Sequence, residues 1–339
     1  MRRLTLGTWI SGALLGAAPA RASQELAYSA KSTRGPCVTH SFLEEWRDAQ
    51  RARDVPALLR YPEGPGPFPV IVFSHGLGGT RWNYAYAGEH WASHGFVVVH
   101  LQHAGSDEAV WRESSRPLQA LQAATRDLDT LVDRPLDVRF ALDELERRSR
   151  RADWPLAGKL DFERVGVAGH SFGAYTALCA AGRDLVKPFG GRVVVRDARI
   201  RACVAMSPQG SERERRNGTW STFECPVLHM TGTLDTSPIT PDVGPTERRI
   251  PFEAIERAQQ YLLVLEGAEH LAFGDSERRA ASRRDPRHWP LILASSTAFF
   301  EAYLRGDTAA LVWLREGGFE RTLGPHDTFE AKLPSAKAR

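Results

Sequence analysis

The stretch RVGVAGHSFGAYTALCAAG, residues 164–182, constrains the fold more than any other. An apolar run, VGVA, leads into GHSFG at residues 169–173, and an alanine-rich segment follows at once. The run is typical of a buried strand, and the alanines suit a helix packed closely on a sheet. Glycines on both sides of Ser171 remove side chains that would clash in a sharp turn. The stretch therefore predicts a strand, a tight turn that exposes Ser171, and a helix.

Five further segments each contain a short continuous apolar run instead of an alternating pattern, which indicates strands buried on both faces of a parallel sheet. They span residues 67–76, 94–103, 201–208, 226–232 and 261–270.

Helical patterns alternate with these strands at residues 83–96, at 138–145 after Pro135, at 295–306 and at 307–318. Such alternation predicts an α/β fold, with a mostly parallel central sheet and helices on both faces. Residues 44–64 are expected to form a hairpin at an antiparallel edge of this sheet.

Residues 1–22 have the composition of a secretory signal peptide. Two arginines precede an apolar stretch, and Ala20-Arg21-Ala22 fits a cleavage site before Ser23. The stretch is too short and too broken by glycine to predict a membrane span. We expect an exported protein, periplasmic or extracellular, in which residues 23–339 form a single domain; an N-terminal core helix is the alternative. The oligomeric state stays open.

Charge gives no reason to expect a nucleic-acid partner. The 339 residues hold 44 Lys and Arg against 41 Asp and Glu, and residues 1–22 hold three arginines and no acid. The mature chain is therefore close to neutral. The arginine-rich segments at 144–151 and 212–216 also contain glutamates, which is typical of solvated faces.

Four cysteines, an even number, permit disulfides in an exported protein and leave their pairing open. Cys179 and Cys203 lie in apolar segments, which equally fits buried thiols. The cysteines are not spaced as zinc ligands. They are Cys37, Cys179, Cys203 and Cys225.

A serine hydroxyl becomes a nucleophile only with a base, and that base needs an orienting acid. Asp235 follows the strand at 226–232, and His270 ends the strand at 261–270. Carboxyl ends of parallel strands meet at one edge of a sheet, so both side chains are expected beside Ser171. A turn aspartate and a loop histidine are the plainer interpretations of these residues.

Other acids and histidines fit less well. Asp242 lies farther from its strand end, Asp275 follows the histidine, and His170 is expected to point away from the site as a bystander. The remaining candidates lie within strands or upstream of the serine, and we expect them in the core or around the site; they are His100, His103 and His229.

Acyl transfer also needs two N–H groups that stabilise the negative charge on the carbonyl oxygen. The amide of Phe172, directly after the serine, is one candidate. Leu77, within the sequence HGLGG at residues 75–79, is the other, because the glycines let that loop approach a substrate closely. A merely flexible turn is the alternative for this loop.

Residues 104–134 form the longest segment between a strand and the next helix, at the edge where ligands bind in such sheets. We expect them either to cap a pocket or only to pack on the domain. Trp82, Tyr84 and Trp111 are expected to line an apolar substrate pocket, or else to be core or surface aromatics.

These motifs, in this order, resemble the α/β-hydrolases, and most of all their dienelactone-hydrolase and platelet-activating-factor-acetylhydrolase-like branch. The resemblance spans about residues 40–305 and rests on YPEGPGPFPVIVFSHGLGG, HWASHGFVVV, VGVAGHSFGAYTA, TGTLD and GAEHLAF. It implies the α/β-hydrolase fold, a Ser171–His270–Asp235 triad, and an oxyanion hole made by the Leu77 and Phe172 amides. It also implies serine-esterase chemistry without a metal or organic cofactor.

Dienelactone hydrolases use a cysteine nucleophile, so the serine at residue 171 favours carboxylic-ester hydrolysis through an acyl-enzyme intermediate. The expected partner is a small-molecule or lipid-like ester. Two alternatives remain: an acyltransferase with the same triad, and a non-catalytic binding protein on a hydrolase fold.

Overall fold

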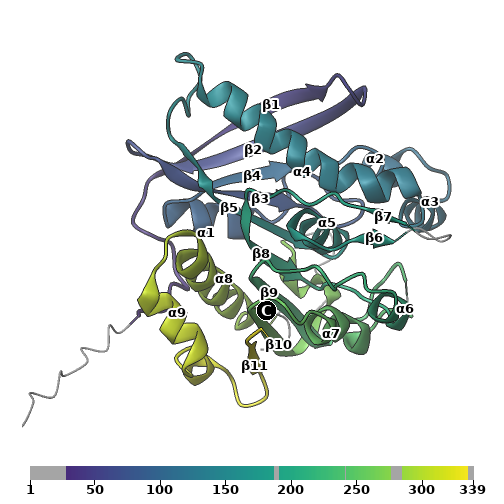
Figure 1. Ribbon diagram of the computed structural model, residues 1–339, viewed down its shortest axis with the longest axis vertical. Helices are drawn as coiled ribbons and strands as arrows, with labels where there is room; N and C mark the ends of the chain where they lie inside the picture. Colours follow the sequence, from purple (N-terminus) through teal and green to yellow (C-terminus); the bar gives the residue numbers. More distant parts are fainter. Residues whose placement is uncertain (1–27, 187–190, 241, 276–284, 335–339) are drawn as a thin grey trace, which may run out of the picture.

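A nine-stranded sheet runs through the part of the chain that the computed structural model describes, residues 28–186, 191–240, 242–275 and 285–334 (Figure 1). The expected signal peptide, residues 1–22, lies outside these ranges. In sheet order the strands are β1 (Thr39–Asp48), β2 (Arg53–Pro62), β4 (Val97–Leu101), β3 (Phe68–Ser74), β5 (Leu160–His170), β8 (Ile200–Met206), β9 (Val227–Leu234), β10 (Gln260–Glu269) and β11 (Thr328–Lys332).

The sheet is parallel from β4 to β10 in this order and antiparallel at both edges. The β1–β2 hairpin pairs antiparallel with β4, as the polar sequence at 44–64 predicts. Every residue of β4 is buried, because a central strand in a two-sided sheet exposes neither face. The predicted mostly parallel α/β sheet is confirmed.

Helices cover both faces of the sheet, and each face has its own apolar core. One face carries α1 (Ala85–Ser93), α8 (His288–Leu304) and α9 (Thr308–Arg315) (Figure 1). The opposite face carries α4 (Leu128–Ser149) and α5 (Phe172–Ala181). The smaller elements are α2 (Ala109–Arg112), α3 (Pro117–Ala124), β6 (Leu185–Val186), β7 (Arg192–Val193), α6 (Glu212–Arg216), α7 (Pro245–Ala254), η1 (His270–Phe273) and η3 (Glu320–Thr322).

The sequence pattern places this helix after Pro135, but α4 begins earlier, at Leu128. The Asp127 side chain accepts the Thr130 N–H at 3.0 Å and caps the helix. Pro135 lies inside the helix and has no N–H for the Leu131 carbonyl. The Tyr175 hydroxyl donates to that carbonyl instead, at 3.2 Å, so the proline is tolerated.

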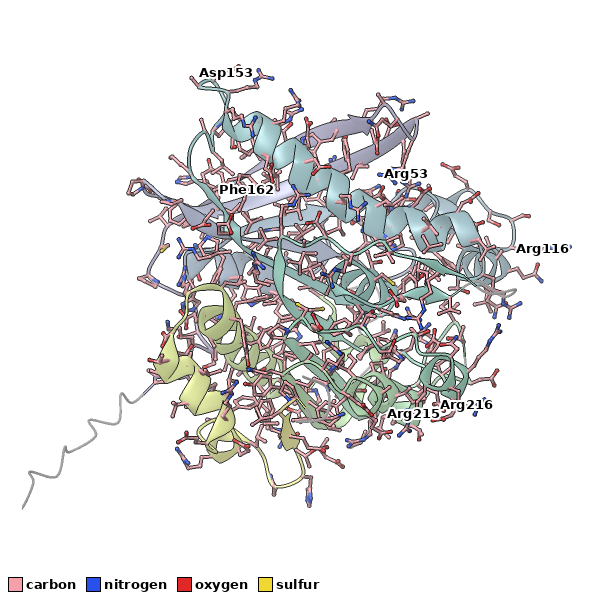
Figure 2. All side chains as sticks on the ribbon, viewed as in Figure 1. Arg53, Arg116, Asp153, Phe162, Arg215 and Arg216 are labelled. Carbon is pink, nitrogen blue, oxygen red and sulfur yellow. The ribbon has the colours of Figure 1, made fainter. Side chains whose placement is uncertain are left out.

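Charged side chains cover the smaller helices at the surface. Arg116 projects from the start of α3, and Arg215 and Arg216 project from α6 (Figure 2). The exposed charges of α6 confirm the solvated face expected at residues 212–216. All four cysteines are free, and Cys179 and Cys203 are buried, as expected for core thiols.

Candidate active site

The backbone at Ser171 is left-handed, with φ 55° and ψ −116°, a conformation that costs a non-glycine residue about 1–3 kcal/mol. Both flanking glycines are required by close approach. A Cβ on Gly169 would lie 2.2 Å from the Gly173 carbonyl oxygen, and one on Gly173 would lie 1.9 Å from that of Ser74. The turn therefore holds the serine oxygen out at the carboxyl end of β5, as predicted.

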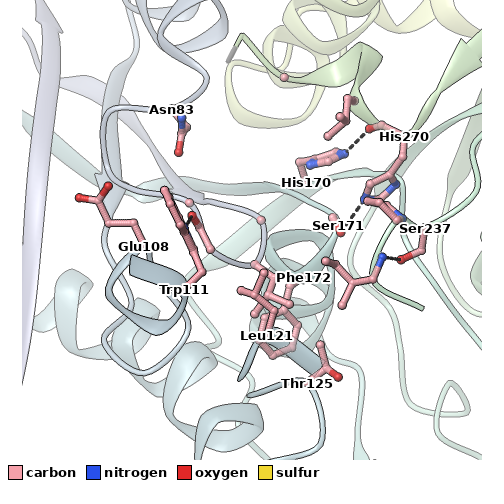
Figure 3. A pocket seen from close by; sticks show the side chains of 18 of the residues that line it. Asn83, Glu108, Trp111, Leu121, Thr125, His170, Ser171, Phe172, Ser237 and His270 are labelled. Carbon is pink, nitrogen blue, oxygen red and sulfur yellow. Dashed lines mark hydrogen bonds between the residues drawn. The ribbon is translucent and has the colours of Figure 1, made fainter. Parts of the chain in front are cut away.

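Three side chains from the ends of β5, β9 and β10 meet at this edge of the sheet. The Ser171 Oγ lies 2.9 Å from His270 Nε2, and His270 Nδ1 lies 2.7 Å from Asp235 Oδ1. Asp235 is fully buried and His270 nearly so. Figure 3 shows the Ser171–His270 contact at the wall of a cavity.

Asp235 is held as a carboxylate. Burial alone would raise its pKa, but the hydrogen bond from His270 and the charge of Arg248 lower the pKa below the ordinary aspartate value. The Thr231 hydroxyl donates to its second oxygen at 2.9 Å. The carboxylate therefore stays charged at neutral pH, where it can orient an imidazole.

Arg248 is a member of this site that sequence reasoning missed. Its fully buried guanidinium places Nε 3.2 Å from Asp235 Oδ1 and Nη2 3.1 Å from His270 Nδ1. It also donates to the Ser207 carbonyl at 3.1 Å, which ties it to the end of β8. No sequence motif marks Arg248, because its role depends on α7 packing beside β9.

His170 is not the bystander that its position on the turn suggests. Its Nε2 donates to the His270 carbonyl at 2.9 Å (Figure 3), and its Nδ1 accepts the Tyr84 hydroxyl at 2.7 Å. Burial, followed by the charge of His270, lowers the pKa of His170 well below its usual value. A neutral His170 thus connects α1 to the loop that carries His270.

The other competitors have separate structural roles. Asp275 accepts the N–H groups of Tyr84 and Ala85 at 2.8 and 2.5 Å, at the start of α1. His229 is buried against Gln260 at 3.1 Å, and Asp242 is exposed. As predicted, His100 and His103 are buried.

The cavity beside Ser171 has a volume of about 590 Å³. Leu77, Phe172, Tyr84 and Trp111 line it, together with residues of α2 and α3. Trp82 does not, contrary to expectation: the residue is 55% exposed, and its ring lies 5.9 Å from the Arg81 guanidinium carbon.

Within the described ranges, no group of three His, Cys, Asp or Glu side chains is arranged to hold a metal ion. None of the helices described there is long and apolar enough to cross a membrane.

The central sheet, the serine turn between β5 and α5, and the aspartate and histidine after β9 and β10 define the class of protein. The chain belongs to the α/β-hydrolase superfamily.

Comparison with known proteins narrows this class. Residues 54–123 match the family model for platelet-activating factor acetylhydrolase, isoform II. Cutinase 1 from Thermobifida cellulosilytica is 26% identical over 278 residues, covering 81% of this chain and 84% of that protein. A cutinase from Thermobifida fusca is also 26% identical over 278 residues, covering 81% of this chain and 73% of that protein.

A platelet-activating factor acetylhydrolase from Canis lupus familiaris is 28% identical over 155 residues, covering 34% of this chain and 32% of that protein. Within its superfamily, the chain is a serine esterase, a carboxylic ester hydrolase.

Proposed function

We propose that Ser171, His270 and Asp235 are the catalytic triad of this esterase. The observation that carries the proposal is the 2.9 Å contact between Ser171 Oγ and His270 Nε2 at the cavity wall. His270 Nδ1 is held by the buried Asp235, which selects the tautomer whose Nε2 accepts a proton. A serine in this arrangement can attack as its proton leaves.

In the proposed reaction, Ser171 Oγ bonds to the ester carbonyl carbon while His270 Nε2 takes the hydroxyl proton. Asp235 stabilises the imidazolium that forms. The tetrahedral intermediate collapses, and the alcohol departs with the proton from His270. Water, activated by the same histidine, then attacks the acyl-enzyme, releases the acid and restores Ser171.

The Leu77 and Phe172 N–H groups are the proposed oxyanion hole. Both residues line the cavity beside Ser171. Within the part of the chain that the structure describes, neither N–H donates a hydrogen bond to another protein atom. Two unused donors beside a nucleophile can receive a developing negative charge, and each such donor contributes about 10²–10³ in rate.

The proposed substrate is a small or lipid-like carboxylic ester. Apolar side chains from three segments form much of the cavity wall, among them Trp111, Leu121, Ile239 and Leu271. Helices α2 and α3 supply the first two, which supports a capping role for residues 104–134. We also propose export after cleavage near Ala22, on the composition of residues 1–22.

The test is hydrolysis of p-nitrophenyl esters, from acetyl to dodecanoyl, by the purified protein and by Ser171→Ala. We expect turnover by the parent and loss of nearly all of it in the variant, with circular dichroism unchanged. The acyl length with the highest kcat/KM then measures the depth of the pocket. Equal turnover by the two proteins would refute Ser171 as the nucleophile.

A further inference from the structure

A second Ser–His–Asp arrangement lies beneath the cavity. The Ser74 Oγ is 2.7 Å from His103 Nε2, and His103 Nδ1 is 2.9 Å from Asp137 Oδ2. All three residues are buried from solvent. Because no substrate can reach Ser74, this arrangement is structural, and its contacts identify what it holds in place.

One of the three residues, Ser74, contacts Arg134, which is a fully buried arginine on α4. Its Nη2 donates to Ser74 Oγ at 2.9 Å and to the His75 carbonyl at 2.5 Å. Its Nη1 donates to Ser106 Oγ and its Nε donates to Thr176 Oγ1, each at 2.8 Å. Each of these acceptors is an uncharged oxygen.

Arg134 reaches the segment that carries the first proposed oxyanion donor. It fixes the His75 carbonyl, two residues before Leu77. The His75 ring donates from Nδ1 to the Gly76 carbonyl at 2.7 Å, and the Gly79 N–H donates to the same oxygen at 3.0 Å. The Gly76 carbonyl and the Leu77 N–H belong to one peptide plane and point in opposite directions. Fixing that carbonyl therefore sets the direction of the Leu77 N–H.

Arg134 also reaches the second donor. Its guanidinium carbon lies 4.6 Å from the centre of the Phe172 ring, within cation–π distance. Thr176, which accepts from Arg134, donates to the Phe172 carbonyl at 2.9 Å. One side chain thus braces the residues on both sides of the proposed oxyanion hole.

The positive charge of Arg134 has no direct counter-ion among the described residues. Asp137, whose charge acts on it, is bound by Arg51 and Arg53 at 2.8 Å each and by His103. Burial lowers the pKa of Arg134 to about 9, so the group is still protonated at neutral pH. A buried charge is costly unless it is compensated, and an oxyanion that forms at the cavity would compensate it.

We propose that Arg134 is the positioning residue of the oxyanion hole, holding the segments of both donors and favouring the anionic transition state by its charge. The inference rests on the proposed triad and oxyanion hole, and it adds a role for a residue that touches no substrate.

The test is Arg134→Met, which keeps most of the side-chain length and removes the charge and the donors. Three quantities are measured: kcat and KM for a p-nitrophenyl ester, and the inhibition constant of an alkyl trifluoromethyl ketone. In that adduct Ser171 Oγ bonds to the carbonyl carbon, His270 takes the proton, and the ketone oxygen becomes an oxyanion. We expect kcat to fall and the inhibition constant to rise by the same factor, about 10- to 100-fold, with KM changed less than about threefold.

Arg183 provides a matched control. It is also a buried arginine against α5, with its guanidinium carbon 4.4 Å from the Tyr175 ring, and it pairs with Glu214 away from the cavity. Arg183→Met should lower the melting temperature but change kcat and the inhibition constant by less than about twofold. Losses equal to those of Arg134→Met would show a general effect of destabilisation and overturn the proposal.

If Arg134→Met does not fold, Arg134→Lys decides. Its single ammonium cannot reach all four oxygens, so we expect smaller changes of about 5- to 20-fold, still equal in kcat and in the inhibition constant. Unchanged values in a folded variant would overturn the proposal. The same assays include the parent and Ser171→Ala: a parent that does not depend on Ser171 refutes the triad, whereas a Ser171-dependent parent with an indifferent Arg134 refutes this inference alone.

Discussion

The molecule contains two Ser–His–Asp arrangements with nearly the same hydrogen-bond lengths and different surroundings. Ser74 is the last residue of β3, and Ser171 directly follows β5, the parallel strand next to it. Ser171 lies on a left-handed turn at the wall of the cavity. Ser74 is fully buried, and its oxygen receives an N–H from Arg134. Access to the cavity, and a serine oxygen that accepts no N–H from the described residues, therefore distinguish the proposed reactive site from the structural one, although the three residue types are the same.

Replacing each serine with alanine should give the largest contrast. Ser171→Ala removes the proposed nucleophile, and we expect kcat to fall by about 10⁴-fold or more with little change in melting temperature. Ser74→Ala removes one acceptor from Arg134, so kcat should fall less than about tenfold while stability decreases by about 1–3 kcal/mol. Ester turnover and urea unfolding measure both. A loss of activity in Ser74→Ala as large as in Ser171→Ala would end the distinction between the two arrangements.

Replacing the aspartate of each arrangement, Asp235 or Asp137, should give the same contrast between loss of activity and loss of stability. Asp235→Asn leaves His270 with the wrong tautomer, so kcat should fall by about 10³- to 10⁴-fold. Asp137→Asn weakens the partly buried pairs with Arg51 and Arg53 and should cost about 2–3 kcal/mol, below the range for fully buried pairs. Its kcat should fall less than about tenfold. Urea unfolding and ester turnover of the two variants, side by side, check the contrast.

Sequence reasoning found the residues whose place follows from chain order. Ser171 was predictable because a buried strand runs directly into a glycine-flanked turn. Asp235 and His270 were predictable because they follow β9 and β10, and the carboxyl ends of parallel strands share one edge. The alternation of strands and helices predicted the sheet for a similar reason.

Residues whose roles depend on helix packing were missed. No sequence pattern marks Arg248 or Arg134 as buried. Their guanidinium groups lie inside the protein because of how α7 and α4 pack. His170 seemed irrelevant because its partners lie 86 and 100 residues away along the chain. The prediction that Trp82 lines the pocket was wrong, because the sequence does not show which way a loop tryptophan near the cavity faces.

Acid should destabilise the two arrangements in different pH ranges. Burial, then the charges of Arg134, Arg53 and Arg51, lowers the pKa of His103 well below its usual value. The unfolded chain therefore takes up this proton first, and stability is lost as pH falls below about 6.5. Asp235, whose pKa is lowered in the folded chain, contributes stability above about pH 3.9 that is lost only below it.

The measurement is the free energy of unfolding in urea between pH 7 and 5. His103→Gln should flatten this pH dependence by about 1.4 kcal/mol per pH unit at most. An identical slope in His103→Gln and the parent would contradict a neutral His103 in the folded protein.

The smallest contrast concerns two buried threonines, one bonded to Asp235 of the proposed triad and the other to Arg134. Thr231 donates to Asp235 Oδ2 at 2.9 Å, and Thr176 accepts from Arg134 Nε at 2.8 Å. Valine has the same shape without the hydroxyl, so each substitution removes hydrogen bonds at nearly constant volume. Because each threonine bonds to a charged group, each variant should lose about 1–3 kcal/mol of stability.

The kinetic effects should differ in kind. In Thr231→Val the carboxylate keeps His270 and Arg248, so kcat should fall only about two- to fivefold. In Thr176→Val the guanidinium keeps His75 and its contact with Phe172, so a fall of similar size should appear together with weaker trifluoromethyl ketone binding. Because the two threonines bond to different charged groups, Asp235 and Arg134, the double variant should show nearly multiplicative losses in kcat. A double variant no worse than either single variant would mean that both threonines act on one shared element, and that the buried arrangement is not a separate support for the oxyanion hole.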